Sequence, residues 1–198
     1  MERRASARRN ETGGLKPAAP PSTTVARVLS TAAHPFVLCP LTVALATRNW
    51  RWTAILAATM ILPLSLVISR NVRRGAWSDA DVSRREQRSG LYWVAIPLLA
   101  IAALVFRAQG APASFQRGLL AVAVLFAVGL VGNRFLKISL HMMFGAFCSV
   151  ILVRVYPWSA VVMIPLVAAL AWSRWKLERH TPAEIAVGIL LGTAAGLF

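Results

Sequence analysis

The chain has 198 residues, of which 57% are hydrophobic and 15% are charged, and its mean hydropathy is +0.60. Soluble domains average about 25% charged residues, so this composition excludes an ordinary soluble domain. The net charge of +15 does not indicate nucleic-acid binding, because the basic residues flank apolar blocks instead of forming one stripe. We therefore expect an integral membrane protein surrounded by membrane lipids.

Residues 1–30 are polar and rich in Arg, Ala, Pro, Ser and Thr. No apolar stretch follows the early arginines, so the pattern is not that of a secretory signal peptide. We predict that 1–30 is a disordered basic tail and that 31–198 is a membrane-embedded helical domain.

Seven apolar segments follow the tail, and they predict an all-α, polytopic bundle of membrane helices. Their approximate ranges are 32–47, 51–69, 91–106, 118–133, 140–156, 158–172 and 182–198. The first segment is the weakest, because it contains Pro35 and Pro40. We expect seven transmembrane segments if it crosses the membrane and six if it is re-entrant.

Lysine and arginine set the expected orientation of the bundle. With the N-terminus inside, most of these residues fall in the inner segments, as the positive-inside rule requires. The outer segments contain only Arg48, Arg51, Arg107, Arg117 and Arg154. We therefore expect a bacterial inner (plasma) membrane protein whose polar clusters, at 70–90, 137–141 and 173–184, all face the cytoplasm.

The C-terminal cluster reads "SRWKLERHTPAE" over 173–184. His180 and Glu184 are four residues apart, which places them on one face of a helix. A carboxylate bonded to one imidazole nitrogen makes the other nitrogen a better nucleophile or base. Arg174 precedes them, and its guanidinium suits a phosphate group. The alternative is a structural His–Glu pair beside arginines that face lipid headgroups.

The middle cluster reads "KISLH" over 137–141. Ser139 is a candidate N-cap for the next helix, whose first N–H groups would form an anion site. Lys137 adds a positive charge, and His141 is able to donate a proton. In the alternative interpretation, Lys137 extends to the membrane surface and His141 packs in the bundle.

The loop "SDADVSRREQRSGLY" over 78–92 supplies Asp79, Asp81, Arg85 and Arg88. Arg85 and Arg88 are three residues apart, so a helix would turn both toward one anion. The two aspartates either hold those arginines or bind a divalent cation. The first role requires no extra ligand, and we favour it.

Two of these clusters resemble signatures of the phosphatidic-acid phosphatase type 2 superfamily. "SRWKLERHTPAE" matches SRxxxxxHxxxD with Glu184 in place of Asp, and "ISLH" is similar to PSGH. The signature KxxxxxxRP is absent, and the 79–88 loop resembles a DxDxxxRxxR variant of some prokaryotic members. The resemblance covers about 79–198.

This resemblance implies a metal-independent phosphatase that needs no cofactor and acts on a polyprenyl or glycerolipid phosphate or diphosphate. His180 would attack phosphorus, Glu184 would orient it, and His141 would protonate the leaving oxygen and later activate water. The remaining candidates would stabilise the phosphate charge. They are Arg174, Ser139, Lys137, Arg85 and Arg88.

Two other classes of protein were weighed. A prenyltransferase or CDP-alcohol-type transferase needs two aspartate-rich motifs to hold Mg²⁺, and this chain has only the Asp79/Asp81 pair. A non-enzymatic membrane protein is disfavoured, because three ionisable clusters are expected at one membrane face. The sequence gives no indication of oligomeric state.

Overall fold

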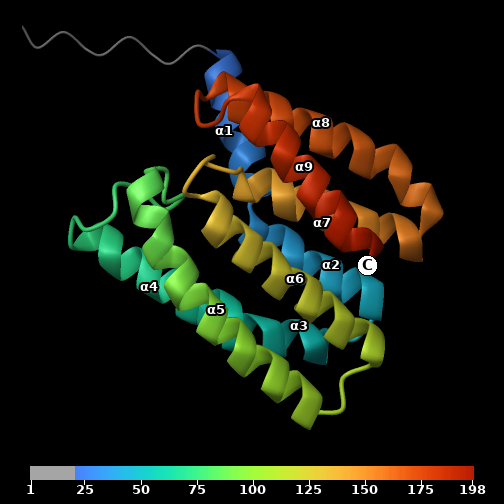
Figure 1. Ribbon diagram of the computed structural model, residues 1–198. Coiled ribbons are helices and arrows are strands. Elements are labelled where there is room, and N and C mark those ends of the chain that lie inside the picture. The colour runs from blue at the N-terminus through green and yellow to red at the C-terminus, as the bar shows by residue number, and fades with distance from the viewer. Residues whose placement is uncertain (1–20) are drawn as a thin grey trace, which may run out of the picture.

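The computed structural model describes residues 21–198, and within this range every regular element is a helix (Figure 1). The elements are α1 Pro21–Ala32, α2 Pro35–Thr47, α3 Trp50–Leu56, η1 Ala57–Ile61, α4 Leu62–Arg73, α5 Arg85–Ala108, α6 Ala113–Gly132, α7 Leu140–Val155, η2 Pro157–Ser159, α8 Ala160–Lys176 and α9 Pro182–Leu197. The π-helical η1 joins α3 and α4 into one long helix.

Among the described residues, four helices are long and apolar enough to cross a membrane: 50–73, 85–108, 113–132 and 157–176. The pair α1 and α2, bent by 48° at a short break, would make a fifth if it forms one broken span. The expected count of six to seven is therefore not confirmed. α7 and α9 have 16 residues each, fewer than the ~20 that span a hydrocarbon core.

The boundary of the predicted tail needs correction. Residues 1–20 lie outside the described residues, but 21–30 belong to helix α1. This helix packs on α8, where the Ser173 hydroxyl donates to the Ala26 carbonyl over 2.6 Å and Ala26 is fully buried. Small side chains on one face allow this contact, although the polar composition of the segment suggested a tail.

Helix α7 forms the centre of the bundle, and every residue from His141 to Ser149 is buried. Its closest neighbour is α9, which turns Gly188, Gly192 and Gly196 toward it. A Cβ at Gly192 would lie 2.0 Å from the Met143 carbonyl oxygen, so only glycine permits this approach. Spacing of small residues by four is typical of helices that pack closely in membranes.

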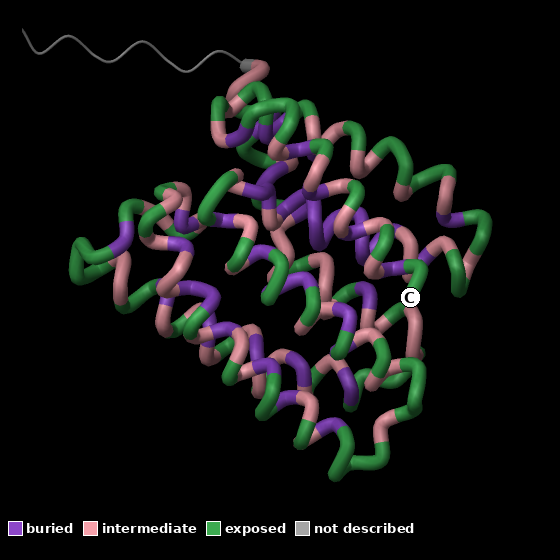
Figure 2. Tube along the Cα trace, in the orientation of Figure 1, coloured by how far each residue is buried: buried purple, intermediate pink, exposed green. Residues whose placement is uncertain are grey.

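The outer helices have exposed residues along their outer faces (Figure 2), and many of these residues are large and apolar. Leu66 is 66% exposed, Leu104 69% and Val161 80%. Apolar surface on several helices at once is compatible with a lipid environment.

Candidate active site

The histidine in the C-terminal cluster lies in the turn between α8 and α9. The turn includes Glu178 in the left-handed region, with φ 53°, and it leaves His180 buried. The His180 Nδ1 atom lies 3.1 Å from the Glu184 carboxylate and 3.1 Å from the Lys137 carbonyl oxygen. Both partners accept hydrogen bonds, so Nδ1 carries the proton and Nε2 has a free lone pair.

Glu184 also stabilises the start of α9. Its carboxylate accepts the Thr181 N–H over 3.0 Å, and the Thr181 hydroxyl accepts the Glu184 N–H over 3.3 Å, which together form a capping box. The Glu184 carbonyl also accepts the Ser139 N–H over 3.3 Å. One residue therefore orients His180, begins α9 and ties α9 to the segment that precedes α7.

Arg88 approaches the other side of the imidazole. Its Nη2 atom lies 3.4 Å from the His180 Nε2 atom, and the side chain is 2% exposed. The Ile138 and Val82 carbonyls accept two further bonds from this guanidinium. Val82 has φ 47°, an unusual conformation for a β-branched residue, and its carbonyl helps to hold Arg88.

The two aspartates do hold arginines, but not the pair that the sequence analysis named. Asp81 lies 3.0 Å from Arg174, which also donates to the Ser30 hydroxyl over 2.6 Å. Asp79 lies 3.3 Å from Arg179. The expected partners were Arg85 and Arg88, which follow the aspartates in the same 78–92 segment. Instead, the fold brings the 177–181 turn and the end of α8 to the aspartates.

The remaining predicted residues have different surroundings. Ser139 is the N-cap of α7, as expected, and its hydroxyl accepts the Met142 N–H over 3.5 Å. Arg85 donates to the Asn133 carbonyl, and the Asn133 amide donates to the Arg85 carbonyl over 3.0 Å. Arg85 therefore connects the start of α5 to the end of α6, and its contacts do not include His180.

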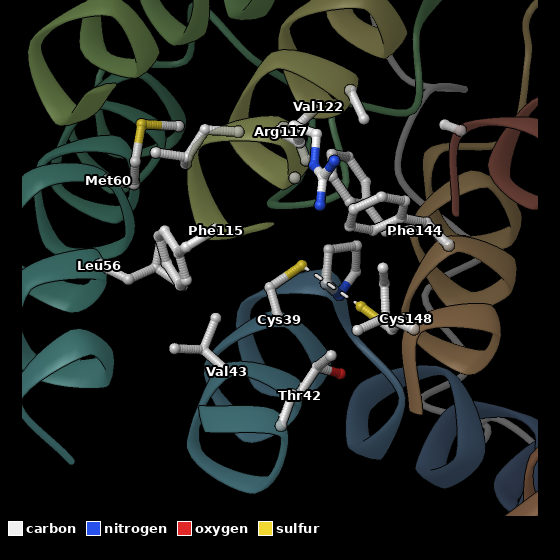
Figure 3. Close-up of a pocket in the computed structure, with 18 of the residues that line it drawn as sticks. Cys39, Thr42, Val43, Leu56, Met60, Phe115, Arg117, Val122, Phe144 and Cys148 are labelled. Atoms are coloured by element: carbon white, nitrogen blue, oxygen red, sulfur yellow. Dashed lines mark hydrogen bonds between the residues drawn. The ribbon is translucent and has the colours of Figure 1, made fainter. Parts of the chain in front are cut away.

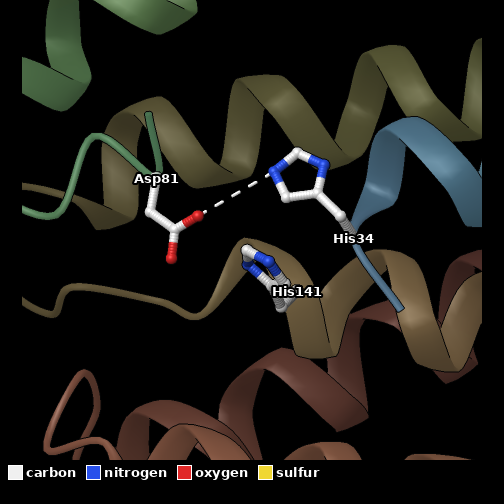
Figure 4. A group of neighbouring side chains, drawn as sticks. All are labelled: His34, Asp81 and His141. Atoms are coloured by element: carbon white, nitrogen blue, oxygen red, sulfur yellow. Dashed lines mark ion pairs between the residues drawn. The ribbon is translucent and has the colours of Figure 1, made fainter. Parts of the chain in front are cut away.

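His141 lies in the first turn of α7 and is 5% exposed. Its Nε2 atom is buried and has no hydrogen-bond partner among residues 21–198. The His141 ring packs edge-to-face against His34, with 4.8 Å between the ring centroids. His34 stands at the break between α1 and α2, and its Nε2 atom is 3.9 Å from Asp81 (Figure 4).

His34 and Ser30 were not among the predicted site residues, and Asp81 was expected to hold other arginines. His34 was one of only three histidines, and its position directly before Pro35 was the available signal. Ser30 fell inside the segment that we expected to be disordered. Their approach to Asp81 and Arg174 depends on tertiary packing of α1 and α2, which no local pattern reveals.

The electrostatics of the turn favour a neutral His180. Burial, together with the neighbouring positive charges of Arg88, Arg174 and Lys137, lowers the pKa of His180 to about 2. Burial also lowers the pKa of Lys137, against the opposing effect of Glu184. At neutral pH His180 is therefore neutral with Nε2 unprotonated and facing Arg88, and the nearby cations give the turn a positive electrostatic environment.

Two cavities lie beside this cluster. The larger, about 480 Å³, has mostly apolar walls from α2, η1, α6 and α7, including Met60, Phe115 and Phe144 (Figure 3). The smaller, about 50 Å³, is lined by His34, Asp81, Arg88 and His141 together with apolar side chains. The two cavities share wall residues, namely Pro35, Phe36, Leu64, Phe126 and Phe144.

The chain matches no protein-family model, no curated protein and no solved structure. The geometry of the site must therefore support any assignment of function.

Proposed function

We propose that the chain is an integral membrane phosphatase that hydrolyses a lipid phosphate or diphosphate through a phosphohistidine intermediate. One observation supports this most: His180 has its Nδ1 atom fixed by Glu184 and its Nε2 atom facing Arg88. A neutral, oriented imidazole beside a buried guanidinium is the arrangement that nucleophilic attack on a phosphate requires.

In the first step, the His180 Nε2 lone pair attacks phosphorus. The bond from phosphorus to the leaving oxygen breaks, its electron pair goes to that oxygen, and His141, which the negative charge of the bound phosphate keeps protonated, donates a proton to it. The Nδ1–H of His180 stays bonded to Glu184, which stabilises the positive charge that develops on the ring. The products are a phosphohistidine and the lipid alcohol, or the lipid monophosphate from a diphosphate.

In the second step, a water oxygen attacks phosphorus while His141 takes the proton from that water. The nitrogen–phosphorus bond breaks, its electron pair returns to His180 Nε2, and inorganic phosphate leaves. His141 is then protonated and ready for the next turnover.

Several groups support the phosphate during both steps. Arg88 already points at His180, and Arg174 is positioned by Asp81 and Ser30. Lys137 adds charge, and the first turn of α7, capped by Ser139, offers backbone N–H groups. Arg85 is assigned to this cluster only because it lies at the start of α5, three residues before Arg88. Its own hydrogen bonds join α5 to α6.

The larger cavity suits the apolar chain of the substrate. Its walls are apolar along most of their area, and it shares residues with the small cavity that reaches His141. A lipid chain in the larger cavity would place its phosphate end toward His180.

The proposal includes a membrane arrangement. We propose that α7 and α9 also cross the bilayer, which gives six to seven spans, and that the membrane is the bacterial inner membrane. The N-terminus and the His180 cluster then face the cytoplasm, in keeping with the positive-inside rule.

The transferase alternative has less support. It requires Asp79 and Asp81 to bind Mg²⁺, but Asp81 pairs with Arg174 and Asp79 with Arg179. Each carboxylate already has a cationic partner, which opposes the binding of a metal cation.

The test is phosphate release by the purified protein from phosphatidate, farnesyl phosphate and farnesyl diphosphate, with and without EDTA. We expect activity that survives EDTA and is abolished in His180→Ala. The exposed Arg107→Ala variant, at the other end of the bundle and in the lining of neither cavity, is the control for folding, checked by circular dichroism. Near-normal activity of His180→Ala, trapping of acid-labile phosphate on His141, or Mg²⁺-dependent activity would overturn the proposal.

A further inference from the structure

His34, Asp81 and His141 come from three separate elements and converge beside the small cavity (Figure 4). One ligand-type atom of each lies within 4.8 Å of the others. Two histidines and a carboxylate are a common ligand set for transition metals.

Two features of the cluster oppose a metal. The His34 Nδ1 atom accepts the Phe36 N–H over 3.1 Å as the N-cap of α2. The proton of the neutral ring is therefore on Nε2, which faces Asp81 and has no lone pair for a metal. The other oxygen of Asp81 lies 3.0 Å from Arg174, so a strong positive charge already occupies that side.

The same features suit an anion. The small cavity is lined by the buried Arg88 guanidinium and by His141, whose Nε2 atom has no partner in the described part of the chain. It is also lined by His34, whose Nε2–H is 3.9 Å from the lining residue Asp81 and so makes no hydrogen bond to it. Buried polar groups are costly when they lack partners, so this set favours a ligand that accepts hydrogen bonds. Asp81 is neutralised by Arg174 and orients His34.

The small cavity also has a defined place in the site. Arg88 lines it and also contacts His180, so this guanidinium lies between the cavity and the proposed nucleophile. On its other side the small cavity shares Phe36 and Phe144 with the large apolar cavity. A ligand that runs from the nucleophile to the apolar cavity passes through this polar chamber.

We propose that the small cavity lined by His34, Arg88 and His141, here called the His34 chamber, binds the second phosphoryl group of a lipid diphosphate. It thereby makes the enzyme select diphosphates over monophosphates. This rests on the proposed function. His180 attacks the terminal phosphorus, and the bond from that phosphorus to the bridging oxygen breaks with its electron pair on the oxygen. His141 supplies a proton to the departing lipid monophosphate, whose phosphate remains beside His34 and Arg88 until release.

The variant His34→Asn tests the proposal with little risk to folding. Asparagine is a good N-cap and keeps an acceptor for the Phe36 N–H, but it lacks the donor that faces Asp81. We expect kcat/KM for farnesyl diphosphate to fall roughly 10–100-fold, the loss typical of a hydrogen bond to a charged group. The value for farnesyl phosphate should change little. Asn49→Ser, which alters the N-cap of α3 at the other end, is the matched control.

A second measurement does not depend on turnover. The inactive His180→Ala variant should bind inorganic pyrophosphate more tightly than phosphate, and adding His34→Asn should remove that preference. An equal loss of kcat/KM for farnesyl diphosphate and farnesyl phosphate, or no preference for pyrophosphate, would overturn the proposed role of the His34 chamber. Stoichiometric Zn²⁺ binding that His34→Asn abolishes would identify a metal site instead. Pyrophosphate preference without any phosphatase activity would sink the proposed function and leave the chamber standing.

Discussion

The two ends of the bundle differ in how deeply they bury arginine side chains. At the end with the His180 cluster, Arg88 and Arg174 are each 2% exposed. At the other end, the arginines are exposed: Arg48, Arg51, Arg107, Arg117 and Arg154. Within residues 21–198, every acidic residue is at the first end: Asp79, Asp81, Glu86, Glu178 and Glu184.

The partners differ as well. Arg48 donates to the Tyr156 hydroxyl, Arg51 to the Gln109 amide oxygen and Arg154 to carbonyls at the end of α9. These are neutral groups at a surface, as expected of residues that anchor helices at a membrane interface. A buried guanidinium is expensive and needs fixed partners, and Arg88 and Arg174 have them in backbone carbonyls, Asp81 and Ser30.

The largest expected effect concerns His141, which lies at the end of the bundle that buries Arg88 and Arg174. His141→Ala should slow turnover of lipid phosphates by ~10²–10⁴-fold, the usual contribution of a positioned acid. An aryl phosphate, which has a better leaving group, should be affected much less, whereas His180→Ala should stay inactive on both. Steady-state kinetics on the two substrates measure the difference, and equal losses would remove His141 from the role of acid.

The next effect compares arginines at the two ends. Arg88→Ala should lower kcat by ~10²–10³-fold, because a fixed donor to the developing charge is lost. Arg107→Ala should leave kcat unchanged, since Arg107 is exposed in the last turn of α5 and lines neither cavity. Parallel kinetics of the two purified variants provide the check. A similar loss of kcat in both variants would mean that the arginine buried beside His180 has no special role in turnover.

A smaller effect is expected at Glu184. Glu184→Gln keeps a hydrogen-bond acceptor for His180 but loses the charge, so activity should fall roughly 10–100-fold. Glu184→Asp should keep measurable activity, although the shorter side chain weakens the capping box. The exposed Glu86→Gln is the matched control. If Glu184→Gln is as active as the control, Glu184 serves only to cap α9.

The last prediction concerns sidedness and expects no change in activity. With Cys39 and Cys148 replaced, Lys176→Cys should resist an impermeant thiol reagent added to intact cells. Ser114→Cys, at the opposite end, should react. The reverse pattern would invert the orientation and place the chemistry on the outer face.

Much of the helical architecture was predictable, because long apolar blocks and helix-start residues are local signals. Ser139 was recognised as the cap of α7 from its position alone. His180 does pair with Glu184, four residues later, but His180 lies in the turn before the N-cap Thr181 and not on the helix face that the spacing predicted. These features depend on neighbours in sequence.

The remainder depends on packing between distant segments. The partners of Asp79 and Asp81 come from α8 and the turn after it, about a hundred residues away. His34 reaches His141 only because α1 and α2 bend at the break before Pro35. The glycines of α9 were visible in sequence, but their meaning, close backbone approach to α7, required the fold.

The shortness of α7 and α9 has a consequence for the depth of the chemistry. Arg154 bonds the carbonyls of Gly196 and Leu197, so both helices end at the same level. Their 16 residues rise ~24 Å, whereas the hydrocarbon core is ~30 Å thick. In the proposed arrangement, in which both helices cross the bilayer with that shared end at one interface, His141 and Glu184 would begin their helices ~6 Å inside the opposite boundary. Such hydrophobic mismatch would thin the bilayer around the site, so a lipid headgroup would meet the proposed catalytic residues without leaving the membrane plane.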